Sequence, residues 1–251
     1  MNALILVIIS SLSFVIGYFI TKLFKDKSKL NNASIAMAFT VLIGLLITDL
    51  IPHLGHHFEG ITIGLKIMNI VIYVITGLGL LKILDMLMPS HHHNHKEHDD
   101  NIEEHTHNLE HIGLITTLSI LLHNFLESIA MYNIGLESIK AGALMALAVS
   151  LHNIPLSIGI STSIESKNKK YKFGIISLLI LSTIIGPILF HLDILKSNEY
   201  LSGMLIAITI GMVLYLIVFE FFKQVKTNIK KRETIIGILI GLAIILLIQI
   251  I

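Results

Sequence analysis

Cysteine is absent from this chain of 251 residues, and charged residues make up only 14% of it. Without cysteine there is no disulfide framework, no thiolate nucleophile and no cysteine metal site. A soluble domain carries roughly 25% charged residues, whereas here hydrophobic residues reach 54% and the mean hydropathy is +0.82. The composition therefore predicts an integral membrane protein, and it excludes a cytosolic enzyme, a disordered chain and a secreted disulfide-rich scaffold.

Long apolar runs predict an all-α fold. A membrane-spanning helix needs about 20 mostly apolar residues, and the sequence contains eight such runs. They form a single transmembrane domain over residues 1–251, which contains one polar, His-rich loop at 90–111. The predicted spans are residues 3–21, 33–53, 61–86, 112–134, 139–163, 173–195, 200–222 and 233–251.

Basic residues gather at one end of the predicted bundle. The segments that follow the first, third, fifth and seventh spans contain 14 of the 18 Lys and Arg residues. The opposite end has only Lys66, Lys140 and Lys196. Since cationic loops stay in the cytoplasm, we expect a multi-pass protein of the plasma membrane with both termini extracellular and the His-rich loop cytoplasmic.

The fourth span contains two ionisable side chains, which are expensive at membrane depth and are therefore functional candidates. His123 and Glu127 are four residues apart, so they share one face of a helix. An imidazole and a carboxylate at this spacing can chelate a divalent ion. The alternative is a His–Glu hydrogen bond that fixes helix packing.

The fifth span repeats the pattern, because both spans contain the sequence L-H-N-x-x-x-S-I. His123 lies about 16 Å inside the membrane from one face and His152 about 20 Å from the other, so both reach the middle of a core about 30 Å thick. Pro155 frees the carbonyl of Leu151 for an ion or water, or it simply kinks the helix. The predicted metal site consists of His123, Asn124, Glu127, His152 and Asn153.

Other polar residues mark a candidate pathway for the ion. Asp49 and His53 lie near the outer end of the second span, and His191 lies near the outer end of the sixth. Glu220 lies toward the inner end of the seventh span in an otherwise apolar run. The alternative is that these residues are simply solvated at the membrane interface.

The loop at 90–111 is acidic and unusually rich in histidine. Neutral imidazoles with Asp and Glu bind zinc-like ions weakly and in several arrangements. The alternative is a soluble low-complexity linker. The candidate loop ligands are His91, His92, His93, His95, His98, His105, His107 and His111.

Taken together, these motifs resemble the ZIP (Zrt/Irt-like) family of divalent metal transporters. The matching residues are His123-Asn124-x-x-Glu127 and His152-Asn153-Ile154-Pro155, with Leu50-Ile51-Pro52 and the run from Gly211 to Glu220. The resemblance implies eight spans with the fourth and fifth at the centre of the bundle. It also implies a two-metal site in which His123 and Glu127 hold the first ion, Asn124 and Asn153 line the second, and His152 is a ligand or near-ligand.

The sequence departs from the family pattern at two carboxylates. Leu156-Ser157 replaces the family's Glu-Gly in the fifth span, and Gly186 precedes Pro187 where the sixth span usually offers a Glu. Losing two anionic ligands makes two adjacent cations hard to neutralise. Our hypothesis is a single, more neutral site built from His123, Glu127 and His152.

The resemblance implies inward transport of zinc, with iron or manganese as alternatives, by alternating access of the 1-4-5-6 spans against the 2-3-7-8 spans. Zinc is then a transported substrate, and we expect no organic cofactor, no catalytic residue and no nucleic-acid partner. The expected partners are divalent ions, the lipid bilayer and a second copy of the chain in a homodimer. The alternatives are a transport-poor relative that senses or buffers metal and, much less favoured, an intramembrane metalloenzyme.

Overall fold

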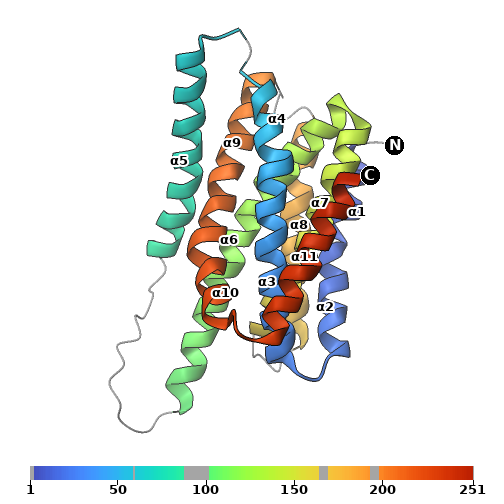
Figure 1. The fold of residues 1–251 in the computed structure, drawn as a ribbon, viewed down its shortest axis with the longest axis vertical. Helices are drawn as coiled ribbons and strands as arrows, with labels where there is room; N and C mark the ends of the chain where they lie inside the picture. The colour runs from blue at the N-terminus through green and yellow to red at the C-terminus, as the bar shows by residue number, and fades with distance from the viewer. Residues whose placement is uncertain (1–2, 59, 88–101, 164–168, 193–197, 251) are drawn as a thin grey trace.

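The computed structural model describes residues 3–58, 60–87, 102–163, 169–192 and 198–250, and every regular element in these ranges is helical (Figure 1). Two short stretches, labelled η, are π-helices within longer helices. The elements are α1 (Ala3–Ser11), α2 (Ser13–Leu23), α3 (Lys27–Leu45), η1 (Leu46–Leu50), α4 (Ile51–His56), α5 (Ile63–Leu87), α6 (Ile102–Glu137), α7 (Ile139–Ser163), α8 (Lys169–His191), α9 (Glu199–Tyr215), η2 (Leu216–Phe221), α10 (Phe222–Asn228) and α11 (Arg232–Ile250).

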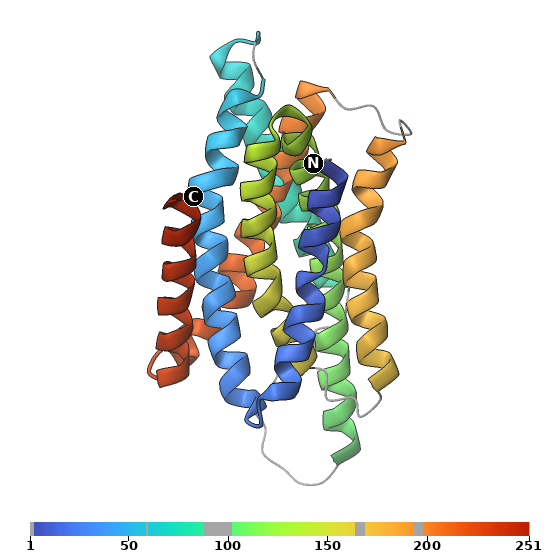
Figure 2. The same cartoon turned by 90° about the vertical axis from the view of Figure 1, so that its right-hand side faces the viewer.

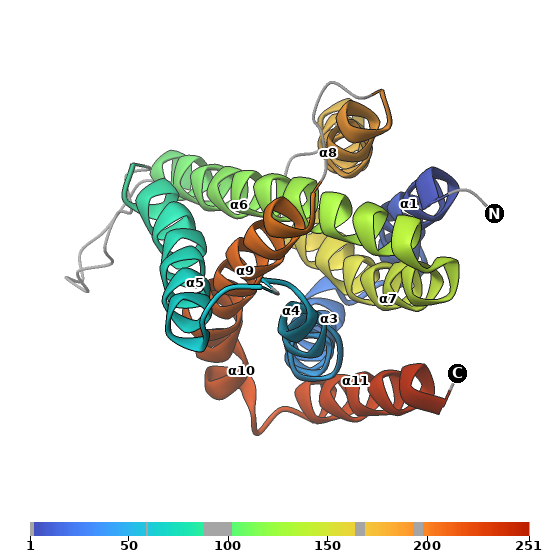
Figure 3. The ribbon, with the colours of Figure 1, turned by 90° about the horizontal axis from the view of Figure 1, so that it is seen from above.

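The helices confirm the predicted all-α membrane fold. Seven helices within the described ranges are long and apolar enough to cross a membrane. They correspond to seven of the eight predicted spans, and the remaining span, 112–134, forms the greater part of α6. The helices α6 and α7 contact each other, and each also packs on several neighbours, which places them in the interior of the bundle (Figure 3).

Several helix boundaries differ from the prediction by four residues or more, as in the sixth span (Lys169–His191) and at the end of the seventh (Asn228), and two further differences have a cause in the sequence. The second span begins at Lys27 rather than at 33, because Asp26 caps α3 by accepting a hydrogen bond from the Lys29 backbone N. This hydrogen bond lowers the pKa of the exposed Asp26 carboxyl. Helix α6 begins at Ile102, so residues 102–111 continue a helix rather than the predicted loop. This stretch contains neither Gly nor Pro, so nothing in it breaks the helix.

Successive spans run in opposite directions, and both chain termini lie toward the same end of the bundle (Figures 1 and 2). We call this the upper end. The connections from α2 to α3 and from α10 to α11 lie at the opposite, lower end, together with the beginning of α8. The lower end therefore carries the exposed basic residues Lys22, Lys25, Lys27, Lys29, Lys170, Lys223, Lys226, Lys230, Lys231 and Arg232.

The packing divides the helices into two groups. The central bundle contains α1, α2, α6, α7 and α8, and the flanking bundle contains α3–α5, α9–α11 and both π-helices. Close helix contacts within each group depend on glycine. In the flanking bundle Gly77 and Gly211 bring the backbones of α5 and α9 together. In the central bundle a Cβ on Gly17 of α2 would lie 2.5 Å from the Ile154 carbonyl oxygen of α7.

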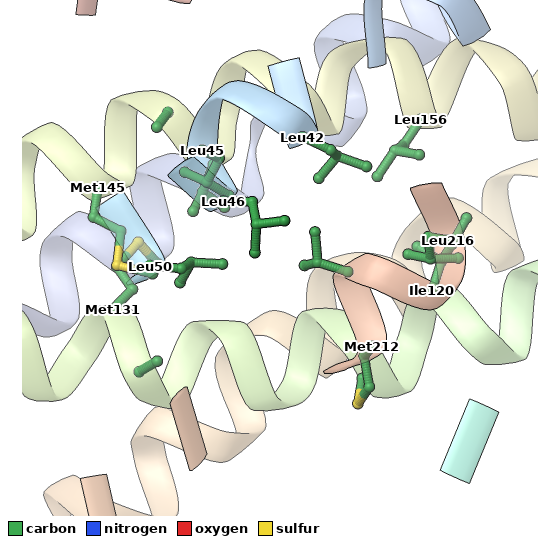
Figure 4. Packing of buried hydrophobic residues seen from close by; sticks show 14 of the residues in the cluster. Leu42, Leu45, Leu46, Leu50, Ile120, Met131, Met145, Leu156, Met212 and Leu216 are labelled. Atoms are coloured by element: carbon green, nitrogen blue, oxygen red, sulfur yellow. The ribbon is translucent and has the colours of Figure 1, made fainter. Parts of the chain in front are cut away.

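The two bundles meet mainly where α3 packs on α7 and where α6 packs on α9. Aliphatic and methionine side chains fill this interface (Figure 4). The labelled side chains come from α3, η1, α6, α7, α9 and η2, and all of them are buried. They are Leu42, Leu45, Leu46, Leu50, Ile120, Met131, Met145, Leu156, Met212 and Leu216.

Candidate metal site

Three ligand-type side chains meet where α6 and α7 run side by side. His123 and Glu127 lie one turn apart on α6, and His152 comes from α7. His123 Nε2 is 3.7 Å from Glu127 Oε1, and His152 Nε2 is 3.3 Å from Glu127 Oε2. One ligand atom from each of the three lies within 4.8 Å of the others, so a single ion placed between them can contact all three.

The hydrogen bonding of His152 fixes which ring nitrogen faces Glu127. His152 Nδ1 is 3.2 Å from the Ala148 carbonyl oxygen. A carbonyl can only accept a hydrogen bond, so Nδ1 carries a proton, and Nε2 is the nitrogen that faces the Glu127 carboxylate. At 3.3 Å from the carboxylate oxygen, Nε2 can either donate a hydrogen bond when it is protonated or share a metal ion with Glu127 when it is not. An imidazole oriented through its second nitrogen is the usual arrangement for a metal ligand.

The triad is removed from solvent. Its three side chains are at most 1% exposed. Both ring nitrogens of His123, Nε2 of His152 and Oε1 of Glu127 form no hydrogen bond within the described part of the chain. Buried polar atoms without partners are costly, and binding one cation would satisfy most of these atoms together.

The two asparagines of the predicted site directly follow the ligand histidines in the chain. Asn124 is 1% exposed and Asn153 is 0% exposed. All four of their amide atoms lack a hydrogen-bond partner among the residues described. Each amide oxygen is a neutral potential donor one residue along the helix from a triad histidine, and it carries no negative charge.

The two positions where carboxylates are missing are filled by packing. Leu156 is 3% exposed, and the neighbouring Ser157 Oγ donates to the Phe14 carbonyl oxygen over 2.6 Å. At Gly186, an added Cβ would lie 2.7 Å from Ile129 Cγ1 and 3.0 Å from the Phe125 carbonyl oxygen. The glycine thus lets α8 approach α6 closely. The ionisable donors of the site are therefore two imidazoles and one carboxylate.

Asp49 and His53 lie above the triad on η1 and α4. Their side chains are 3.7 Å apart, from Asp49 Oδ1 to His53 Nδ1. Asp49 is close enough to Glu127 for the two charges to interact. It also lines a cavity of about 260 Å³ between α3, α7 and α11. Ala148, whose carbonyl orients His152, forms part of the same wall.

Two polar residues of this cavity were missed by sequence reasoning. Thr48 precedes Asp49 on η1, and Gln249 lies near the end of α11. Gln249 could have been identified as a candidate site residue from the sequence, because the last span contains no other polar side chain after Thr234. Gln249 is far from the central histidines in the sequence, so the sequence did not indicate that it lies near their site in the fold.

The other predicted pathway residues do not join the triad. His191 is exposed at the upper end of α8, and its Nδ1 is 3.0 Å from the Tyr132 hydroxyl. Glu220 lies on η2, close to Asp85, which accepts a hydrogen bond from the Tyr215 hydroxyl over 2.9 Å.

The predicted loop ligands lie beyond what the structure describes. Residues His91, His92, His93, His95 and His98 are outside the described residues. His105, His107 and His111 belong to α6, but their side chains are outside the described part.

Fold and site together define a helical membrane protein with a buried triad of potential metal ligands between its two central helices. Residues 87–249 match the sequence pattern of the family described as ZIP zinc transporter. The match covers more than half of the chain, and the chain belongs to the ZIP family.

Two curated relatives are both named zinc transporter ZupT, from strains K279a and R551-3 of Stenotrophomonas maltophilia. The first is 25% identical over 172 residues, which is 67% of this chain and 64% of the relative. The second is 25% identical over 170 residues, which is 66% of this chain and 63% of the relative. The chain thus matches slightly less than two thirds of the length of these relatives.

Proposed function

We propose that this protein carries zinc across the plasma membrane into the cytoplasm, and that the ion binds between His123, Glu127 and His152. Iron and manganese are the other candidate substrates. The observation that carries the proposal is the convergence of His123, Glu127 and His152, whose ligand atoms lie within 4.8 Å of one another in a fully buried position. Membership of the ZIP family and the names of the two relatives also support zinc.

The ligand chemistry favours one zinc ion. Two imidazoles and one carboxylate are typical zinc ligands, and three protein ligands leave a further position open. The amide oxygens of Asn124 and Asn153, or water, are the available donors for that position. Because Glu127 is the sole carboxylate of the triad, a second adjacent divalent ion would add charge that no further carboxylate of the triad neutralises. We therefore propose a single ion per transport cycle.

The arrangement of the bundles supports alternating access. All three ligands belong to the central bundle, so the site can move as a unit. The interface with the flanking bundle is aliphatic (Figure 4), and aliphatic surfaces can repack without breaking many polar contacts. The cavity beside Asp49 is also lined by Ala148, whose carbonyl contacts His152, and we assign it as the entry side for the ion.

The distribution of basic residues supports the direction. The lower end carries most of the lysines, and positive loops face the cytoplasm. The upper end, with both termini and the Asp49 cavity, is then extracellular. No step of this cycle makes or breaks a covalent bond, so we propose a transporter rather than an enzyme.

Zinc uptake into proteoliposomes tests the proposal. We expect the native chain to take up zinc and His123→Ala to abolish uptake, because the variant removes one of three ligands. Leu122→Ala is the matched control, since it removes a side chain of similar size from the neighbouring position without removing a ligand. Uptake by His123→Ala at the native rate would contradict the site.

The same assay addresses a second candidate function, a metal buffer or sensor. This function is favoured because Leu156 and Gly186 stand where the family pattern has carboxylates. Both positions are closely packed and offer no metal ligand. A chain that binds zinc but fails to move zinc, iron or manganese would support the buffer and contradict transport.

A further inference from the structure

Two hydrogen bonds between described residues connect the central bundle to the flanking bundle, one near each end of the molecule. Near the upper end, Asn133 Nδ2 on α6 donates to Ser202 Oγ on α9 over 3.2 Å. Near the lower end, Thr162 Oγ1 on α7 lies 2.8 Å from Asn31 Oδ1 on α3. We call these contacts the upper link and the lower link.

The upper link lies in a buried setting. Asn133 and Ser202 are each 3% exposed. Asn133 Oδ1 finds no hydrogen-bond partner among the residues the structure describes, so the bond from Nδ2 to Ser202 is the interaction that holds this amide. Losing it would leave a buried amide with no partner in the described chain, which is unfavourable unless the end opens to water.

The lower link is maintained in either orientation of the asparagine amide. The Thr162 hydroxyl is also 2.9 Å from the carbonyl oxygens of Ile158 and Gly159 on its own helix. A hydroxyl has one proton to donate. If that proton goes to the helix, Asn31 can turn its amide and donate to Thr162 Oγ1 instead, because the oxygen and nitrogen positions are interchangeable.

The two links occupy equivalent positions around the metal site. Asn133 follows His123 by ten residues on α6, and Thr162 follows His152 by ten residues on α7. Since α6 and α7 run in opposite directions (Figure 1), the links lie about 15 Å above and about 15 Å below the ligands.

The partner residues on the flanking bundle show the same relation. Ser202 precedes Glu220 of η2 by 18 residues, and Asn31 precedes Asp49 of η1 by 18 residues. Helices α3 and α9 also run in opposite directions. This is the arrangement of an inverted repeat, so each link is the counterpart of the other at the opposite end.

From this arrangement we propose that the two links are end latches, each of which keeps its own end of the interface closed. Opening the upper end separates α6 from α9 and breaks the upper link, while the lower link can persist. Opening the lower end separates α3 from α7 and has the reverse effect. The inference rests on the proposed function, because alternate opening of the two ends serves a transporter.

Distances between spin labels test the latches without any transport assay. The chain has no cysteine, so introduced pairs are the sole labelling sites. Glu137→Cys with Glu199→Cys reports the upper end, and Ser28→Cys with Lys170→Cys reports the lower end. Each pair joins an exposed residue of one bundle to an exposed residue of the other. The measurements are made in lipid nanodiscs without metal.

We expect Ser202→Ala to increase the ratio of open to closed molecules at the upper pair by roughly two- to tenfold, the effect of one net hydrogen bond on an equilibrium. The lower pair should not open. Thr162→Val should open the lower pair and not the upper pair, and Thr162→Ser should restore the native distribution. The matched controls are Ser177→Ala and Thr227→Val, whose hydroxyls bind their own helices on exposed faces.

Unchanged distances in both variants, or opening of the same end by both, would overturn the latches. Such results would leave the proposed transport untouched, since the readout requires no metal. Conversely, a native chain that moves no metal but shows both end-specific shifts would contradict the proposed function and retain the latches.

Discussion

His152 illustrates how a local backbone contact determines what a side chain can bind. The Ala148 carbonyl, one turn earlier on α7, accepts a hydrogen bond from Nδ1–H, and the Nε2 atom of the ring then faces Glu127. The i,i+4 spacing of His123 and Glu127 made that pair predictable, and the repeated His-Asn motif predicted its meeting with His152. The tautomer of His152 was not predictable, because it depends on the ring orientation in the folded bundle.

Leu156 offers a direct test of the missing carboxylate. It lies one turn after His152 and is buried, so Leu156→Glu places a carboxylate on the ligand face of α7. We expect this variant to be less stable than the native chain without metal, because it buries an unpaired acid. Saturating zinc should then raise its Tm by more than it raises the native Tm. Equal zinc-induced shifts, measured by thermal unfolding in detergent, would contradict this placement.

Gly186→Glu is the variant to compare with Leu156→Glu, because the family pattern has a carboxylate at this position as well. An added Cβ already lies closer to Ile129 than real side chains approach, and it lies within 3.0 Å of the Phe125 carbonyl oxygen. We expect a loss of about 1–3 kcal/mol from overpacking, with no zinc-dependent recovery. The sequence could not reveal this, since Gly186 and Phe125 become neighbours only when α8 packs on α6.

Helices were the best predicted features, because hydropathy alone locates runs of about 20 apolar residues. The predicted helix boundaries were wrong mainly where a helix ends in polar residues. Asp26 extends α3 downward by capping it, and the acidic, His-rich stretch 102–111 continues α6. The π-helices η1 and η2 escaped prediction, although each contains a pathway candidate, Asp49 or Glu220. A π-helix is often found at a functional site, but its hydropathy pattern does not distinguish it from α-helix.

Glycine contacts between helices can be tested at Gly211. Its added Cβ would meet the backbone of α5 at Val74 and Leu78, so we expect Gly211→Ala to destabilise the protein by about 1–3 kcal/mol. Gly79 is the matched control on α5, because nothing lies within 4 Å of a Cβ there. Gly79→Ala should be neutral or stabilising by up to about 1 kcal/mol, since alanine favours helix. A similar Tm for both variants would contradict the close packing of α5 and α9.

The complete bundle combines a central group that contains the three candidate ligands with a flanking group that contains Asp49 and most of the cavity beside it. Eight spans and their alternation could be predicted from charge and hydropathy, and the central place of the fourth and fifth was implied by the resemblance to the ZIP family. The division into two groups, the Asp49 cavity and the two end links could not, because they depend on which helices pack together. Gln249 is an example, because it lines the same cavity as Thr48 and Asp49 only in the folded bundle.

Zinc coordination in the purified chain is the most direct test of the buried site. The eight histidines between residues 91 and 111 are first replaced by glutamine, so that the loop binds no metal. We expect equilibrium titration to give one tightly bound zinc per chain, and X-ray absorption to find two imidazole nitrogens with oxygen donors around it. His152→Ala should remove one imidazole and weaken binding by at least about tenfold. Zinc binding that His152→Ala leaves unchanged in affinity and spectrum would contradict the site.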